Sequence, residues 1–148
     1  MLLCGIFALL VKISLEDYCY RRVRHRYLIA LLLILLSLWS VFPNYDVLPY
    51  TLAILVSGVV LFSLRLLGAG DTKLLVVLSL GIDPALIPIL LYATVILGFL
   101  LAVAYLVYGC IYDLSLVREK GIPYAIPISV SGGCCIALSY MDWFDINF

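Results

Sequence analysis

Long apolar runs separated by short polar connections restrict the fold of this chain more than any other feature of its sequence. Residues 28–42, LIALLLILLSLWSVF, hold no charge, and residues 85–108 form a longer run of the same kind. A membrane-spanning helix needs about 20 predominantly apolar residues and satisfies its own backbone hydrogen bonds. Of the 148 residues, 66% are hydrophobic and 12% are charged, which excludes an ordinary soluble domain. The sequence therefore predicts an all-α, polytopic integral membrane protein.

Turn and charge signals divide the chain into about six transmembrane helices within a single domain, residues 1–148. A fourth, short helix is expected to begin within GAGD and to end before the turn that Asp83 and Pro84 predict. The sixth helix is expected to be interrupted by its prolines and glycines. The other expected spans are residues 1–15, 28–42, 47–67, 85–108 and 122–141.

The basic residues all fall in or beside one set of alternating loops when six spans are counted. The opposite loops hold Asp46 and Asp83 and no basic residue. By the positive-inside rule, the basic side faces the cytoplasm and both termini face outside. We therefore expect a multi-pass protein of the cytoplasmic membrane. The basic residues on which this orientation rests are Arg21, Arg22, Arg24, Arg26, Arg65, Lys73, Arg118 and Lys120.

The cysteines and the basic cluster give no sign of a metal or nucleic-acid site. The five cysteines form no CxxC pair, and the single histidine, His25, has no cysteine at ligand spacing. The cluster RRVRHR, residues 21–26, is suited to anionic lipid at the membrane surface. It is too short to form a module that reads bases, so we expect the lipid bilayer and not a nucleic acid as a partner.

Two acidic residues are expected at the same membrane depth. Asp17 follows the first span and Asp71 opens the fourth helix, so both lie at cytoplasmic helix ends. Charged groups at membrane depth cost about 3 kcal/mol each, so they tend to be paired or functional. Two carboxyl groups around one water are the arrangement of an aspartic protease, in which one is ionised and the other protonated. Such a site needs no cofactor.

The glycines of GAGDTK fit this interpretation. Gly68 and Gly70 would allow positive φ angles, or would let a substrate strand or a neighbouring helix approach Asp71 closely. The dipole of the fourth helix would favour the ionised form of Asp71. The structural alternative is that Asp71 is a helix N-cap and that Lys73 marks the membrane interface.

Other functions remain open at this stage. Asp17, with Glu16, could simply offset the arginine cluster. A small transporter subunit could use the two aspartates to relay protons or bind a cation, but the outer half of the chain offers few polar residues for a path. A scaffold subunit of a secretion complex would leave GAGD without a purpose.

The two aspartate segments resemble those of the GxGD membrane aspartic proteases, and of the type IV prepilin peptidase family in particular. GAGDTK matches that family's G-x-G-D-x-K motif, and DYCYRRVRH resembles its D-x-x-x-R-R-I-P-N segment through Asp17, Arg21 and Arg22. The chain departs from the second pattern at Arg24 and His25, which replace Pro-Asn. The later segment IPYAIP resembles the family's proline-containing last helix.

The resemblance implies that Asp17 and Asp71 are the catalytic pair. It also implies that the substrate is a prepilin or pilin-like protein, cut after its short basic leader at the cytoplasmic face. Gly68 and Gly70 would shape the approach to Asp71, and Lys73, Arg21 and Arg22 would orient groups at the interface. The chain lacks the CxxC-containing extension of bifunctional members, so we expect cleavage without methylation, similar to peptidases of Flp-type pili or archaeal preflagellins and pilins.

Overall fold

The computed structural model describes residues 2–20, 23–40, 43–111 and 122–147. These residues are helical apart from short connections and contain no strand, which confirms the predicted all-α class for this part of the chain. Short 3-10 turns precede α3 and α5, at Tyr45–Val47 and Pro84–Leu86. The α-helices are α1 (Leu2–Tyr20), α2 (His25–Trp39), α3 (Leu48–Ser63), α4 (Ala69–Ser79), α5 (Ile87–Ile111) and α7 (Ala125–Asn147).

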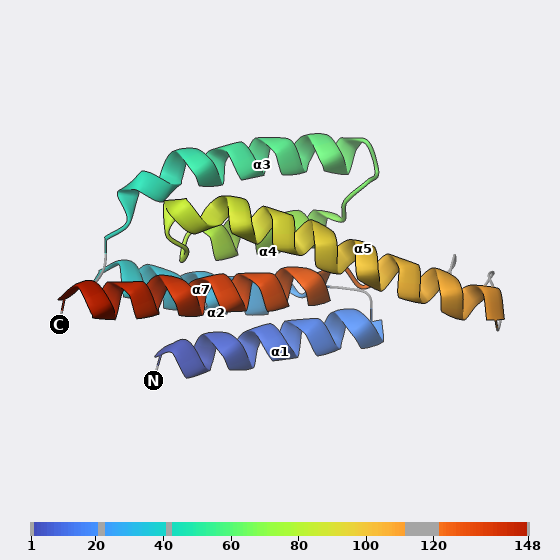
Figure 1. Cartoon of the computed structure of the whole chain (residues 1–148), viewed down its shortest axis with the longest axis horizontal. Coiled ribbons are helices and arrows are strands. Elements are labelled where there is room, and N and C mark those ends of the chain that lie inside the picture. The colour runs from blue at the N-terminus through green and yellow to red at the C-terminus, as the bar shows by residue number, and fades with distance from the viewer. Residues whose placement is uncertain (1, 21–22, 41–42, 112–121, 148) are drawn as a thin grey trace.

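The helices form one elongated bundle in which successive helices run in opposite directions (Figure 1). Helix α7 lies at its centre and packs against α1, α4 and α5, while α3 is held through α4. The C-terminal half of α5 projects beyond the other helices. This order brings the ends of α1 and α3 and the starts of α2, α4 and α7 toward the same end of the bundle.

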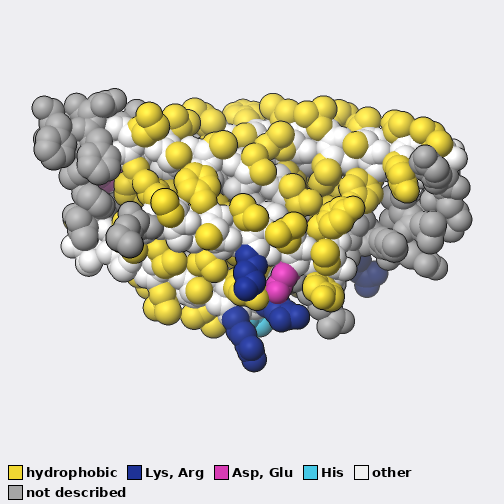
Figure 2. All heavy atoms as spheres, turned by 90° about the horizontal axis from the view of Figure 1, so that it is seen from below, with side chains coloured by type: hydrophobic (Ala, Val, Ile, Leu, Met, Phe, Trp, Pro, Cys, Tyr) yellow, Lys and Arg dark blue, Asp and Glu magenta, His cyan; other side chains and the backbone are white. Residues whose placement is uncertain are grey.

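In the part of the chain that the structure describes, two helices are long and apolar enough to cross a membrane, α3 and α5, each counted with its preceding 3-10 turn. Helices α2 and α7 are apolar over shorter stretches. Helix α4 has 11 residues, which at 1.5 Å per residue gives about 16 Å, roughly half the hydrocarbon thickness. Both long helices and the largely apolar surface in Figure 2 fit a membrane protein, whereas the six-span count stays a prediction.

Helix α3 ends earlier than the predicted span, which ran to residue 67. Its chain reverses at Arg65, whose φ of 59° lies in the left-handed region that normally selects glycine. The Arg65 N–H donates to Phe62 O at 2.9 Å and the Leu66 N–H donates to Leu61 O at 2.9 Å. This pair of bonds is the Schellman pattern, and it closes α3 before the GAGD segment.

Helix α7 is continuous, so the expectation of a proline- and glycine-broken last span is wrong. Pro127 lies in its first turn, where a missing N–H costs nothing because it would have no helical partner. Gly132 and Gly133 serve helix packing instead: a Cβ on Gly132 would lie 2.6 Å from a methyl group of Leu78 in α4. The small residues therefore let α7 lie close to its neighbours.

Hydroxyl pairs join helices inside the bundle. Ser79 of α4 donates to Thr51 of α3 at 3.0 Å, and the hydroxyls of Thr94 in α5 and Ser131 in α7 lie 2.7 Å apart. All four residues are buried. Such bonds replace water inside an apolar bundle and contribute about 0.6 kcal/mol each.

Candidate active site

Asp17 lies in the last turn of α1, because that helix continues to Tyr20 rather than ending near residue 15. Its side chain is buried, with 7% of its surface exposed. The Oδ2 atom accepts a hydrogen bond from the Ala125 N–H, the first residue of α7, at 3.2 Å. The N-terminus of a helix stabilises negative charge, so α7 provides a favourable environment for an Asp17 carboxylate.

Asp71 lies in the first turn of α4, and Gly68 is the N-cap of that helix. The carboxyl group of Asp71 reaches back to the backbone of Gly68, as the third helical residue does in a capping box. A Cβ on Gly68 would lie 2.7 Å from Asp71 Oδ2, so only glycine leaves room for this carboxylate. Asp71 is therefore not the N-cap that the structural alternative assumed.

Gly70 lies where the two motif segments pack against each other. A Cβ at this position would lie 3.2 Å from the Cβ of Val23, tighter than an ordinary contact. Val23 belongs to the segment that follows Asp17, so the small size of Gly70 lets the start of α4 lie against that segment. Neither Gly68 nor Gly70 adopts a positive φ angle, and their role is close approach alone.

The two aspartates influence each other electrostatically. Burial, followed by the nearby negative charge of Asp17, raises the pKa of Asp71 from 3.8 to about 7, against a smaller lowering by its hydrogen bond with the Gly68 backbone. The two carboxyl groups resist simultaneous ionisation, because the charge of Asp17 disfavours the ionised form of Asp71. Burial and the Asp17 charge therefore oppose the helix dipole, which was expected to keep Asp71 ionised.

A pocket of about 880 Å³ opens beside Asp71. Its walls come from the end of α3, the following loop and the C-terminal half of α5, and they are mostly apolar. The segment before α7 also lines the pocket. The lining residues are Phe62, Ser63, Arg65, Leu66, Leu67, Gly68, Asp71, Ala102, Tyr105, Leu106, Ile122 and Tyr124. The pocket is large enough to hold several side chains of a bound molecule, and Asp71 lies in its wall.

The predicted accessory residues lie at the margin of this arrangement. Lys73 is exposed on α4, and Arg21 and Arg22 lie outside the described residues. Nearby, Arg24 pairs with Glu16 at 3.5 Å (Nε to Oε2). Figure 2 shows Lys and Arg side chains gathered with an acidic side chain and a histidine on an otherwise hydrophobic face.

Two contributors to the site escaped the sequence analysis. The Ala125 N–H that bonds to Asp17 is a backbone group, and no residue type signals it. Gly98 of α5 lies against the ring of Tyr124, since a Cβ on Gly98 would be 2.8 Å from Cε1 of that ring. The signal for Gly98 is present in the sequence, because it is the single glycine in the apolar run 85–108.

Comparison with known proteins shows the family of this chain. A model of the type IV leader peptidase family matches residues 4–103, a segment that contains both Asp17 and GAGDTK. The chain belongs to the type IV leader peptidase family. Neither a search of curated proteins nor a search of solved structures found a match. The resemblance found from the two motifs is thereby confirmed, and a prepilin-type peptidase is the general class of this protein.

A type IV leader peptidase that uses a metal would need a cluster of ligands. Within residues 2–20, 23–40, 43–111 and 122–141, no three side chains of His, Cys, Asp or Glu come together as a metal site requires.

Proposed function

We propose that this protein is a membrane aspartic endopeptidase that removes the short basic leader from prepilin-like substrates, with Asp17 and Asp71 as its catalytic pair. The single observation that carries the proposal is that the fold brings Asp17, at the end of α1, and Asp71, at the start of α4, to the same end of the bundle, where the charge of Asp17 raises the pKa of Asp71. The family match supports the general class, since it covers both segments.

The reaction begins with Asp17 ionised and Asp71 protonated. Asp17 accepts a proton from water as the water oxygen bonds to the scissile carbonyl carbon, and Asp71 donates its proton to the carbonyl oxygen. The product of this step is a neutral tetrahedral diol. Asp17 then transfers its proton to the amide nitrogen while Asp71 recovers a proton from one hydroxyl. The C–N bond breaks, giving a carboxylic acid and an amine, and the pair returns to its first state.

The assignment of protons follows from the surroundings of each group. The N-terminus of α7 stabilises a negative charge on Asp17 through the Ala125 N–H. Burial and the Asp17 charge favour the neutral form of Asp71. Two equivalent carboxyl groups are thus given different roles by their environments, as general acid–base catalysis requires.

The end of the bundle that holds Arg24, Arg65 and the start of α4 would face the cytoplasm by the positive-inside rule. A prepilin-like substrate carries a basic leader before a hydrophobic helix. Once that helix lies in the bilayer, its leader junction would reach the same depth as the catalytic pair. The pocket beside Asp71, between α3 and α5, is large and apolar enough to receive the residues around the junction.

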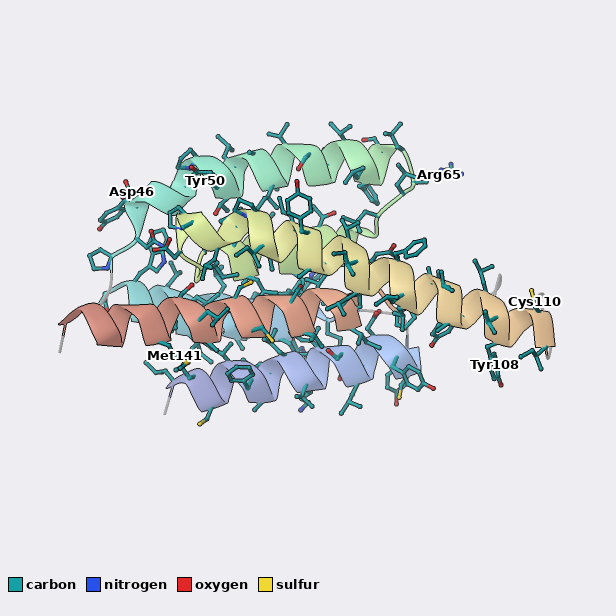
Figure 3. The ribbon with its side chains drawn as sticks, in the orientation of Figure 1. Asp46, Tyr50, Arg65, Tyr108, Cys110 and Met141 are labelled. Atoms are coloured by element: carbon teal, nitrogen blue, oxygen red, sulfur yellow. The ribbon has the colours of Figure 1, made fainter. Side chains whose placement is uncertain are left out.

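Leader cleavage tests the proposal directly. The chain is co-expressed with a pilin-like substrate, and the mobility shift of the cleaved product is compared for wild type, Asp17→Asn and Asp71→Asn. Each substitution keeps the size of the side chain and removes its acid–base function, so we expect cleavage to be lost while membrane insertion persists. A matched control is Asp46→Asn, since Asp46 is exposed at the opposite end of the bundle (Figure 3). Cleavage by both active-site variants at the wild-type rate would refute the assignment.

A further inference from the structure

The pocket beside Asp71 contains few polar side chains. Ser63 is already engaged, because its hydroxyl donates to Val59 O at 2.9 Å. Arg65 lies at the end of α3, and Figure 3 shows its side chain directed away from the helices. The two remaining polar side chains besides Asp71 are the phenols of Tyr105 and Tyr124.

Tyr124 is held in the pocket by a specific contact. Its ring rests on α5 at Gly98, where an added Cβ would lie 2.8 Å from Cε1, 3.3 Å from Cζ and 3.4 Å from the hydroxyl oxygen. Gly98 is buried. A glycine in the middle of a helix costs about 1 kcal/mol relative to alanine, so this position gives up helix stability to accommodate the hydroxyl end of the ring.

The backbone of Tyr124 is tied to the other aspartate. The next residue, Ala125, donates its N–H to Asp17. One dipeptide therefore contacts Asp17 through its backbone and lines the Asp71 pocket through its side chain. Tyr105 differs, because it lies seven residues beyond Gly98 on α5, about 10 Å further toward the projecting end of that helix.

We propose that Tyr124 is a further catalytic residue, whose phenol donates a hydrogen bond to the oxygen of the scissile carbonyl as the tetrahedral intermediate forms. This inference rests on the proposed function. Asp71 supplies the proton to that oxygen, and a phenol lining the same pocket stabilises the charge that develops before the proton has moved. In an apolar pocket such a donor contributes about 10²- to 10³-fold in rate. The contact with Gly98 fixes the ring, so the donor is in place before substrate arrives.

Steady-state cleavage of a synthetic pilin-like peptide by the purified, detergent-solubilised protein tests the role. Tyr124→Phe removes the hydroxyl and keeps the ring, so kcat is expected to fall about 10²-fold or more with KM changed little. Gly98→Ala keeps the hydroxyl and displaces the ring, and we expect a comparable loss in kcat. The double variant should be no slower than Tyr124→Phe alone, since the two changes remove one interaction. Tyr92→Phe is the matched control, because Tyr92 lies on the same helix and is 72% exposed.

Each outcome decides the inference. Wild-type kcat in Tyr124→Phe would overturn it and would leave the ring with a packing role only. Loss of activity in Tyr105→Phe with none in Tyr124→Phe would also overturn it. An Asp71→Asn variant is measured in parallel: activity there would overturn the proposed function, and with it the tyrosine role. An inactive Asp71→Asn with an active Tyr124→Phe would overturn the tyrosine role alone. Equal thermal stability of Tyr124→Phe and wild type shows that the loss is chemical.

Discussion

Substituting Gly68 by alanine is the sharpest test of how Asp71, the proposed catalytic acid, is held in position. Gly68 has φ −73° and ψ 145°, which alanine adopts without strain. The added methyl would lie 2.7 Å from Asp71 Oδ2, whereas ordinary contact begins at 3.4 Å. The carboxyl group must therefore shift by about 0.7 Å, and it weakens its hydrogen bond with the Gly68 backbone in doing so.

The rate penalty follows from that displacement. A catalytic group misplaced by 1 Å costs about 10²-fold, so we expect Gly68→Ala to reduce kcat by roughly ten- to a hundredfold. The assay is leader cleavage by purified protein, with the thermal midpoint measured on the same sample. The backbone tolerates alanine, so the midpoint should change by no more than about 2 °C.

A second glycine provides the control. Gly5→Ala in α1 places its methyl 3.7 Å from Ile34 Cδ1, an ordinary contact, and should cleave at the wild-type rate. If Gly68→Ala also cleaves within twofold of wild type, the close contact between Gly68 and Asp71 does not position the catalytic group, and the reasoning fails.

Three further predictions concern titration and packing. Because Asp71, the proposed acid, has a pKa raised to about 7 by burial and by the Asp17 charge, cleavage should fall about tenfold per pH unit above pH 8, and a cleavage rate that does not change up to pH 9.5 would contradict this. Arg65→Gly removes a left-handed non-glycine residue and should raise the free energy of unfolding by about 0.5–1 kcal/mol, seen as a higher denaturation midpoint in detergent. Gly58→Ala drives a methyl into Thr72 and should lower that free energy by about 1–3 kcal/mol, so an unchanged midpoint would refute the packing of α3 on α4.

The helical class and the approximate positions of the helices could be read from the sequence because the apolar runs are long and their interruptions are sharp. The start of α4 within GAGD was predicted correctly from a glycine-rich segment followed by an acidic residue. The end of α3 was not predicted correctly, because a Schellman turn usually contains a glycine in the left-handed position and here contains Arg65. The continuity of α7 was missed because Pro127 breaks a helix only when it lies beyond the first turn.

The two aspartates of the candidate site could be predicted from the sequence, but their surroundings could not. The acidic residue before the arginine cluster pointed to Asp17 and GAGD pointed to Asp71, since both lie at predicted cytoplasmic helix ends and so at the same expected membrane depth. The direction of the pKa shift of Asp71 depends on its burial and on the nearby charge of Asp17, and only the fold determines both. The contact between Gly98 and Tyr124 joins residues 26 positions apart, and no local pattern links them.

The shortness of α4 has a consequence for the supply of the reacting water. A helix of about 16 Å is much shorter than a hydrocarbon layer of about 30 Å. The bilayer responds to such a mismatch by thinning locally, at a cost of fractions of a kcal/mol per Å. Under the proposed function, we expect water to reach the first turn of α4 from the thinned membrane surface. The hydrolysis rate should then fall as the lipid chains lengthen, because a thicker bilayer buries the site more deeply.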